Sequence, residues 1–338
     1  MKLALMLFSV LRMSIDDIVT CSVAAESAGF SHITVAESFY RDGFALASAI
    51  ASNTDRVNFG TSVIPIYTRT PFQIAMGAST LNEISHGRMG FLGLGVGYRS
   101  RTEQYFGIKQ SRRLQRMREY VEIIKRLLSG EGVTYHGELF NFEKFPRLSA
   151  EPLEVPIYFG SSAPKMLELA GEVAEGVILN SISTPEYVKF ARERIAEGAR
   201  SVGRDPSKIE IGHSVIYAVS EDGQEAIEMA KEDVLFYLSY PELDPVIERS
   251  AFGADVQKIR ESYNKGDNET ALSLISSEML DTFSVYGTPG ECRERLRKFV
   301  GRGVTLPIIR VSMVSREAHQ KKAAFLRAVE SLRGWRPD

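Results

Sequence analysis

The sequence predicts an α/β fold of the (β/α)8 TIM-barrel class, built as one domain over residues 1–338 with insertions after the fourth and seventh strands. Short runs rich in β-branched and apolar residues alternate with longer segments of helical periodicity, which indicates repeated strand–helix units and a parallel sheet. Eight such runs can be counted, as a closed barrel requires. With 44% hydrophobic residues, the chain has enough apolar material for one large core.

The eight predicted strands cover residues 3–8, 32–36, 57–63, 89–94, 155–159, 176–179, 209–219 and 306–311. In such barrels the active site lies at the carboxyl ends of the strands, so the loops that follow them are the places to search. A doubly wound open sheet is the rival architecture, because a linear pattern does not reveal whether the sheet closes.

The predicted helices cover residues 15–28, 44–52, 72–84, 114–128, 165–173, 185–202 and 289–300, several with Ser, Asp, Thr or Pro at the start and Gly at the end. Two segments are longer than the usual connection between one strand of such a barrel and the next. Residues 132–142 alternate like a small hairpin after strand four, and residues 221–281 form a long helical stretch after strand seven. Neither has the composition of a flexible linker.

Charge and composition exclude several function classes. The 41 basic and 43 acidic residues nearly cancel, so no global positive field favours nucleic acid. The apolar start, residues 3–8, is too short for a secretory segment or a membrane span, and we expect a cytoplasmic protein with no membrane partner. Cys21 and Cys292 stand alone, and the five histidines are scattered singly, so neither a disulfide nor a metal site is expected.

Five segments resemble the bacterial luciferase-like monooxygenase superfamily: AESFYRDGF (36–44), NFGTSVIPIYTRTP (58–71), LNEISHGRMGFLGLGVG (81–97), residues 155–179 and residues 285–306. Their order along nearly the whole chain is more specific than any one of them. They are most similar to the members that use coenzyme F420, a deazaflavin, such as methylenetetrahydromethanopterin reductases. The resemblance implies a homodimer, and a cis peptide bond between Ser62 and Val63 that supports the bent ring of the cofactor.

The glycine-rich end of strand four reads GxGxG, and it is followed by Arg99, Ser100 and Arg101 rather than by a Rossmann helix start. The resemblance makes Val96, Gly97 and Arg101 contacts of the cofactor tail, and arginine suits a phosphodiester charge.

A second anion site is predicted after strand five. Gly160, Ser161, Ser162 and Ala163 lead into a helix that begins at Pro164, so backbone amides and two hydroxyls lie together at a helix N-terminus. An ordinary serine N-cap is the simpler interpretation.

Three residues are candidates for chemistry. Glu37 and Ser38 follow strand two, where deazaflavin-dependent relatives often carry Asp and His; this chain keeps the acid and lacks the imidazole. Glu37 could donate a proton if burial raises its pKa, or could bind the ring edge. Tyr98 stands where F420-dependent sugar-phosphate dehydrogenases have a glutamate, so their acid–base mechanism does not carry over.

Three further residues, Tyr67, Arg69 and Asn180, are candidate neighbours of substrate or ring. The favoured hypothesis is an F420-dependent oxidoreductase that exchanges a hydride at the deazaflavin C5 with a small organic substrate. The alternatives are an FMN-dependent luciferase-like monooxygenase and a non-catalytic flavin-binding barrel.

Overall fold

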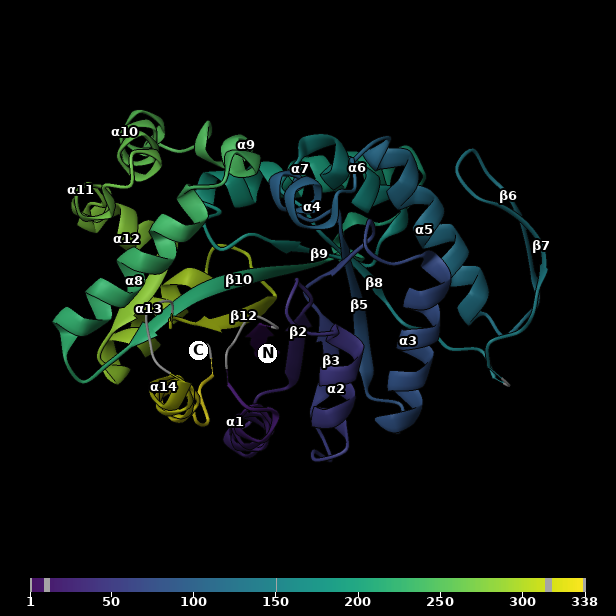
Figure 1. The fold of residues 1–338 in the computed structure, drawn as a ribbon, viewed down its shortest axis with the longest axis horizontal. Helices are drawn as coiled ribbons and strands as arrows, with labels where there is room; N and C mark the ends of the chain where they lie inside the picture. Colours follow the sequence, from purple (N-terminus) through teal and green to yellow (C-terminus); the bar gives the residue numbers. More distant parts are fainter. Residues whose placement is uncertain (1, 9–12, 150, 314–317, 337–338) are drawn as a thin grey trace.

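The computed structural model describes residues 2–8, 13–149, 151–313 and 318–336, which form a closed barrel of eight parallel strands surrounded by helices (Figure 1). The barrel strands are β1 (Ala4–Phe8), β2 (His32–Ala36), β3 (Asn58–Thr61), β5 (Met89–Gly95), β8 (Ile157–Gly160), β9 (Gly176–Leu179), β10 (Glu210–Val219) and β12 (Leu306–Val311). Each neighbours the next, β10 pairs with both β9 and β12, and β12 pairs with β1. The sheet is therefore closed, and the open-sheet alternative was wrong.

All eight predicted strands are present, with one change of detail. The run predicted over 57–63 ends as β3 at Thr61, and a separate two-residue strand, β4 (Ile64–Pro65), resumes the pairing with β5. The residues between the two strands bulge out of the sheet. The sequence pattern predicted one continuous buried strand here and did not reveal the break.

The main helices of the outer layer are α1 (Ile15–Ala28), α2 (Gly43–Ala51), α3 (Pro71–Ile84), α5 (Arg113–Leu128), α6 (Pro164–Val173), α7 (Pro185–Ser201), α13 (Pro289–Val300) and α14 (Ala318–Ser331). Several begin with a side-chain cap: Ser14 accepts the amide of Asp17, and Thr70 and Gln73 form a capping box at α3. The short helix α4 (Arg99–Phe106) was not expected, because it buries only Thr102 and has no apolar stripe.

Both predicted insertions are present. Strands β6 (Val133–His136) and β7 (Asn141–Phe145) pair as an antiparallel hairpin. Its turn is fixed by the buried carboxylate of Glu119 on α5, which accepts the backbone amides of Glu138, Leu139 and Phe140. The hairpin thereby packs against the outer wall beside α5 (Figure 1).

The second insertion contains α8 (Gly223–Leu238), α9 (Asp244–Ile247), α10 (Gly253–Asn264), α11 (Asn268–Ser273) and α12 (Ser277–Phe283). Beyond it lies β11 (Ser284–Gly287), a strand that the sequence did not predict. It pairs in parallel with the last four residues of β10, beyond the part of β10 that pairs with β9. A four-residue buried strand gives too short a pattern to recognise between two helices.

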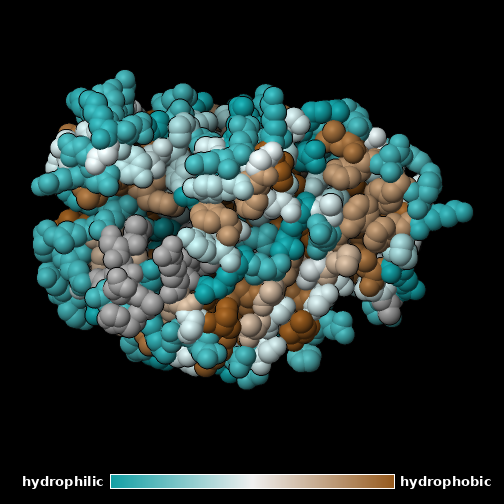
Figure 2. Space-filling model, in the orientation of Figure 1, coloured by the Kyte–Doolittle hydropathy of each residue, from teal (hydrophilic) through white to brown (hydrophobic). Residues whose placement is uncertain are grey.

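The core has two parts. A small cluster fills the inside of the barrel: Ala4, Met6, Phe91, Tyr158, Ile178, Leu306 and Ile308. A larger one lies between strands and helices. The face seen in Figure 2 is largely hydrophilic, with hydrophobic residues in smaller groups. Within the described residues, no helix is both long and apolar enough to span a membrane.

Candidate active site at the barrel mouth

The break between β3 and β4 forms a bulge at the carboxyl end of the barrel. The Ser62–Val63 peptide bond is cis, at the position that the resemblance implies. Neighbouring strands hold both residues: the Ser62 amide donates to the Val35 carbonyl at 2.9 Å, and the Val63 carbonyl accepts the Glu37 amide at 3.2 Å. The bulge is therefore a hydrogen-bonded part of the wall.

Two glycines make room for the side chain of Val63. Gly95 and Gly160 are register partners on β5 and β8. A Cβ atom at Gly95 would lie 2.5 Å from Cγ2 of Val63, and one at Gly160 would lie 2.6 Å from Cγ1. Only glycine fits at either position, and this lets Val63 pack onto the apolar cluster inside the barrel. The bulge thus covers the barrel interior with a platform made largely of backbone.

Three hydroxyl oxygens in or after the carboxyl ends of the strands are buried without a hydrogen-bond partner among the described residues. They belong to Ser62 in the bulge, Ser183 in the loop after β9 and Ser312 just after β12, and the hydroxyl of Thr34, in the middle of β2, is unpartnered as well. A buried polar group left unsatisfied costs about 1–3 kcal/mol. Such groups fit a site where a polar ligand or ordered water completes the bonding. The backbone platform and the unpartnered hydroxyls together fit a polar, ring-shaped cofactor.

Glu37 is held as an ion-paired carboxylate. Its two oxygens accept from Nε and Nη2 of Arg69, both at 2.7 Å, and Oε2 also accepts the Gly43 amide at 2.7 Å. Arg69 further pairs with Asp42, the N-cap of α2. The bonds to Glu37, followed by those to Asp42, raise the pKa of Arg69. This network joins the end of β2 to the loop after the bulge, and Ser38 lies half-buried beside it.

Tyr98 and Asn180 meet across the mouth. The Asn180 Nδ2 donates to the Tyr98 hydroxyl at 3.2 Å, and burial raises the pKa of that phenol. Behind Asn180, the His213 Nε2 donates to its backbone carbonyl at 2.9 Å. Burial lowers the pKa of His213 to about 3, so the ring is neutral at physiological pH. Two predicted residues are thereby in direct contact, and His213 supports them from outside the barrel.

Arg101 lies under the helical insertion. Its guanidinium carbon is 4.8 Å from the Tyr240 ring centroid, 5.3 Å from that of Phe236 and 5.6 Å from that of Phe39. Tyr240 also stacks on Tyr98 at 4.2 Å. The α8–α9 connection therefore covers the β5–α4 junction, where the tail contacts Val96, Gly97 and Arg101 were predicted.

Two polar contacts of the insertion were missed by sequence reasoning. Glu242 Oε1 accepts from the amide and hydroxyl of Ser100, both at 2.9 Å, in the first turn of α4. Asp233 on α8 pairs at 2.6 Å with Arg310 on β12, and both are buried. No sequence spacing relates these positions, because the tertiary fold alone brings the insertion to the barrel.

The remaining predicted residues are engaged elsewhere. The Tyr67 hydroxyl donates to the Ser111 carbonyl at 2.6 Å, toward α5 rather than into the mouth. The Ser161 hydroxyl accepts the amide of Ala163 at 3.1 Å, and the Ser162 carbonyl accepts the hydroxyl of Tyr187. The Gly160–Ala163 turn is thus partly satisfied by its own residues, but neither serine is the N-cap of α6, because the N-cap is Ala163 and it has no side-chain cap.

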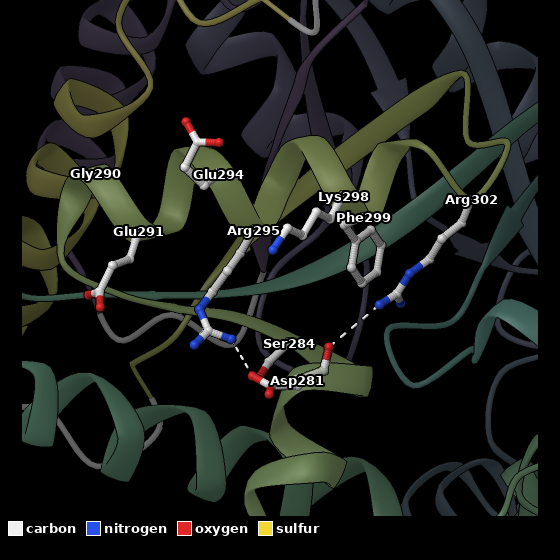
Figure 3. Close-up of a pocket in the computed structure, with 9 residues that line it drawn as sticks. All are labelled: Asp281, Ser284, Gly290, Glu291, Glu294, Arg295, Lys298, Phe299 and Arg302. Carbon is white, nitrogen blue, oxygen red and sulfur yellow. Dashed lines mark hydrogen bonds and ion pairs between the residues drawn. The ribbon is translucent and has the colours of Figure 1, made fainter.

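A surface cleft of about 660 Å³ lies outside the barrel, between α13 and the α12–β11 junction (Figure 3). Arg295 points across it to Asp281, and Arg302 approaches the same residue from the end of α13. Arg295 and Asp281 form an ion pair within the cleft, and none of the predicted site residues lines it. In the described part of the chain, no three His, Cys, Asp or Glu residues are grouped to hold a metal ion.

A family profile described as luciferase-like monooxygenase matches residues 1–306. The chain belongs to this family. A 5,10-methylenetetrahydromethanopterin reductase of Methanolobus tindarius is 34% identical over 284 residues, covering 83% of this chain and 86% of the relative. A reductase of the same name from Archaeoglobus fulgidus is 33% identical over 287 residues, covering 83% and 85%. The structure of a coenzyme F420 dependent tetrahydromethanopterin reductase from Methanopyrus kandleri covers 99% of both chains, with a TM-score of 0.84 and 24% sequence identity.

The luciferase-like assignment agrees with the order of the five segments quoted from the sequence. What the resemblance did not supply is the way this chain's insertion contacts the mouth, through Asp233, Tyr240 and Glu242.

Proposed function

We propose that this luciferase-like protein is a coenzyme F420-dependent oxidoreductase acting on a small organic substrate. The observation that carries the proposal is the platform at Val63, made possible by Gly95 and Gly160, with the unpartnered Ser62 hydroxyl in the same bulge. Relatives named as methylenetetrahydromethanopterin reductases, and a fold match named as coenzyme F420 dependent, support the deazaflavin over FMN.

The ring would be held by the bulge, and the bound deazaflavin would supply hydride chemistry. Ser62 offers its hydroxyl to the polar groups of the ring, which would complete its hydrogen bonding. At the tail end, the N-terminus of α4 and Arg101 offer positive charge to a phosphodiester. Tyr240 and Phe236 from the insertion limit access of water to this end of the mouth.

Glu37 and Tyr98 have different proposed roles. Because two Arg69 nitrogens and the Gly43 amide donate to Glu37, its carboxylate anchors the loop beside the ring rather than donating a proton. Tyr98 retains its proton because burial raises the phenol pKa, so it can donate a hydrogen bond to substrate while Asn180 fixes its position. The cytoplasmic location and the homodimer stay predictions.

A binding titration tests the cofactor assignment. Purified protein is titrated with coenzyme F420 and, separately, with FMN, and quenching of cofactor fluorescence is recorded. We expect F420 to bind at least about tenfold more tightly, a difference of about 1.4 kcal/mol. Tighter binding of FMN would replace the proposal by a flavin monooxygenase. Turnover of the reduced deazaflavin with a carbonyl or iminium acceptor would exclude a non-catalytic barrel.

A further inference from the structure

Gln110 is a buried side chain with no assigned role, in the loop between α4 and α5. It is 8% exposed. Its Nε2 donates to the Val96 carbonyl at 2.7 Å and approaches the Gly97 carbonyl at 3.3 Å and Thr102 Oγ1 at 3.1 Å. Two carbonyl acceptors require a donor, so they fix the amide orientation with the nitrogen toward the turn.

These contacts determine which way the turn faces. In a trans peptide the carbonyl and the following N–H point in opposite directions. Because Gln110 binds the carbonyls of Val96 and Gly97, the N–H groups of Gly97 and Tyr98 point away from it. Neither N–H donates a hydrogen bond to another described residue. Gly97 has φ of 69°, a conformation that lets successive amides converge as an anion-binding nest.

An independent contact indicates that this junction attracts an anion. The first residue before α4, Tyr98, provides no side-chain cap. The carboxylate of Glu242, which comes from the distant insertion, instead accepts the Ser100 amide and hydroxyl. An acidic group reaching from 142 residues away occupies the amide of Ser100, in the first turn of the helix that directly follows the turn held by Gln110.

We propose that Gln110 is a positioning residue for the anionic tail of the cofactor: it holds the Val96–Tyr98 turn so that two backbone N–H groups face the phosphodiester. This rests on the proposed function, because the anion is the F420 tail. Gln110 does not itself touch the ligand. It acts by keeping the turn's carbonyls, which would repel a phosphate, directed toward its own amide.

The test compares F420 with its riboside fragment, which keeps the deazaflavin ring and lacks the phosphodiester tail. In Gln110→Glu the side chain has the same shape but accepts hydrogen bonds instead of donating them, so it repels both carbonyls. We expect the Kd for F420 to rise at least about tenfold and the Kd for the riboside to change less than about twofold. The matched control is Gln257→Glu, an exposed position on α10 where neither Kd should change.

Gln110→Ala provides a second variant, because it removes the donor without adding charge, and it should show the same selective loss of F420 binding. In the wild-type protein, the amide NMR signals of Gly97 and Tyr98 should shift when F420 is added and stay in place with the riboside. Equal weakening of both ligands in the variants, or unchanged amide signals with F420, overturns the role of Gln110. Failure of wild-type protein to bind F420 and riboside alike overturns the proposed function itself.

Discussion

The two ends of the barrel interior are built differently. At the amino-terminal floor, the polar groups are paired: the Tyr158 hydroxyl bonds Glu210, Lys2 pairs with Glu210 at 2.8 Å, and His32 Nδ1 lies 2.9 Å from the Ser31 hydroxyl. Above them the Phe91 and Tyr158 rings stack with centroids 4.5 Å apart. The floor is a closed, satisfied core.

At the carboxyl-terminal mouth, by contrast, backbone and glycine replace large side chains, and the Ser62, Ser183 and Ser312 hydroxyls have no partner among the described residues. The eight strands are thus filled by packed side chains at their amino ends, whereas their carboxyl ends surround polar groups that lack hydrogen-bond partners. The difference indicates that floor residues stabilise the fold and mouth residues bind the ligand. Substitutions at the two ends should therefore separate stability from affinity.

The largest expected effect is on the floor. Phe91→Ala removes a ring that is 1% exposed and stacked on Tyr158, and it should lower the free energy of unfolding by about 3–5 kcal/mol. Chemical denaturation measures the loss. The Kd for F420 of the protein that remains folded should stay within about twofold of wild type. A large change in the Kd for F420 with an unchanged free energy of unfolding would contradict the idea that floor residues act on stability and not on binding.

Because of His32 in the floor, the free energy of unfolding should also fall in mild acid. Burial, and then the charge of Lys2, lower the pKa of His32 from 6.5 to about 4. Below pH 6.5 the unfolded chain binds a proton that the folded chain excludes. The contribution of neutral His32 to the free energy of unfolding is therefore complete above pH 6.5 and is lost as the pH falls toward 4. The free energy of unfolding should fall by up to about 1.4 kcal/mol per pH unit in this range.

Denaturation of wild type and His32→Gln between pH 7 and 4.5 measures this slope. The variant should lose stability less steeply, by about 2 kcal/mol over the range, while buried His213 keeps contributing in both proteins. His136→Gln is the control, since that ring is exposed. Parallel slopes for wild type and His32→Gln would show that His32 is protonated equally in the folded and unfolded chains.

At the mouth, Gly160→Ala should change affinity more than stability. The new Cβ would lie 2.6 Å from Val63 Cγ1, so the bulge must move. We expect the Kd for F420 to rise about tenfold, or about 1.4 kcal/mol, with a stability cost of about 1 kcal/mol. Gly223→Ala, where no atom lies within 4 Å of the new Cβ, is the matched control. An unchanged Kd for F420 in Gly160→Ala would show that the Val63 platform does not contact the cofactor.

The smallest effect concerns the insertion. If the cofactor tail approaches the N-terminus of α4, the Glu242 carboxylate at Ser100 opposes it as a like charge. Glu242→Gln should therefore lower the Kd for F420 about threefold, or about 0.7 kcal/mol, and leave riboside binding unchanged. Glu248→Gln, an exposed position on the same insertion, is the control. Weaker F420 binding in Glu242→Gln would mean that Glu242 helps to hold the tail turn.

The local patterns predicted much of this molecule. Alternation of apolar runs with helical periodicity placed all eight barrel strands, and the family resemblance placed the cis bond at Ser62–Val63. Glycines at 95 and 160 were visible in the sequence, but their use in accommodating Val63 was not. Short elements such as α4 and β11 escaped prediction because they carry too few buried positions to make a pattern.

The sequence by itself determined the order and type of the main elements other than α14, because hydrophobic periodicity is a local property that each segment carries independently. Only the tertiary structure decided that Glu37 pairs with Arg69, that Tyr67 turns toward α5, and that Glu242 reaches Ser100. Ion pairs and hydrogen bonds join residues far apart in the chain, and their distances follow from how the strands and the insertion pack. No spacing along the sequence encodes those distances.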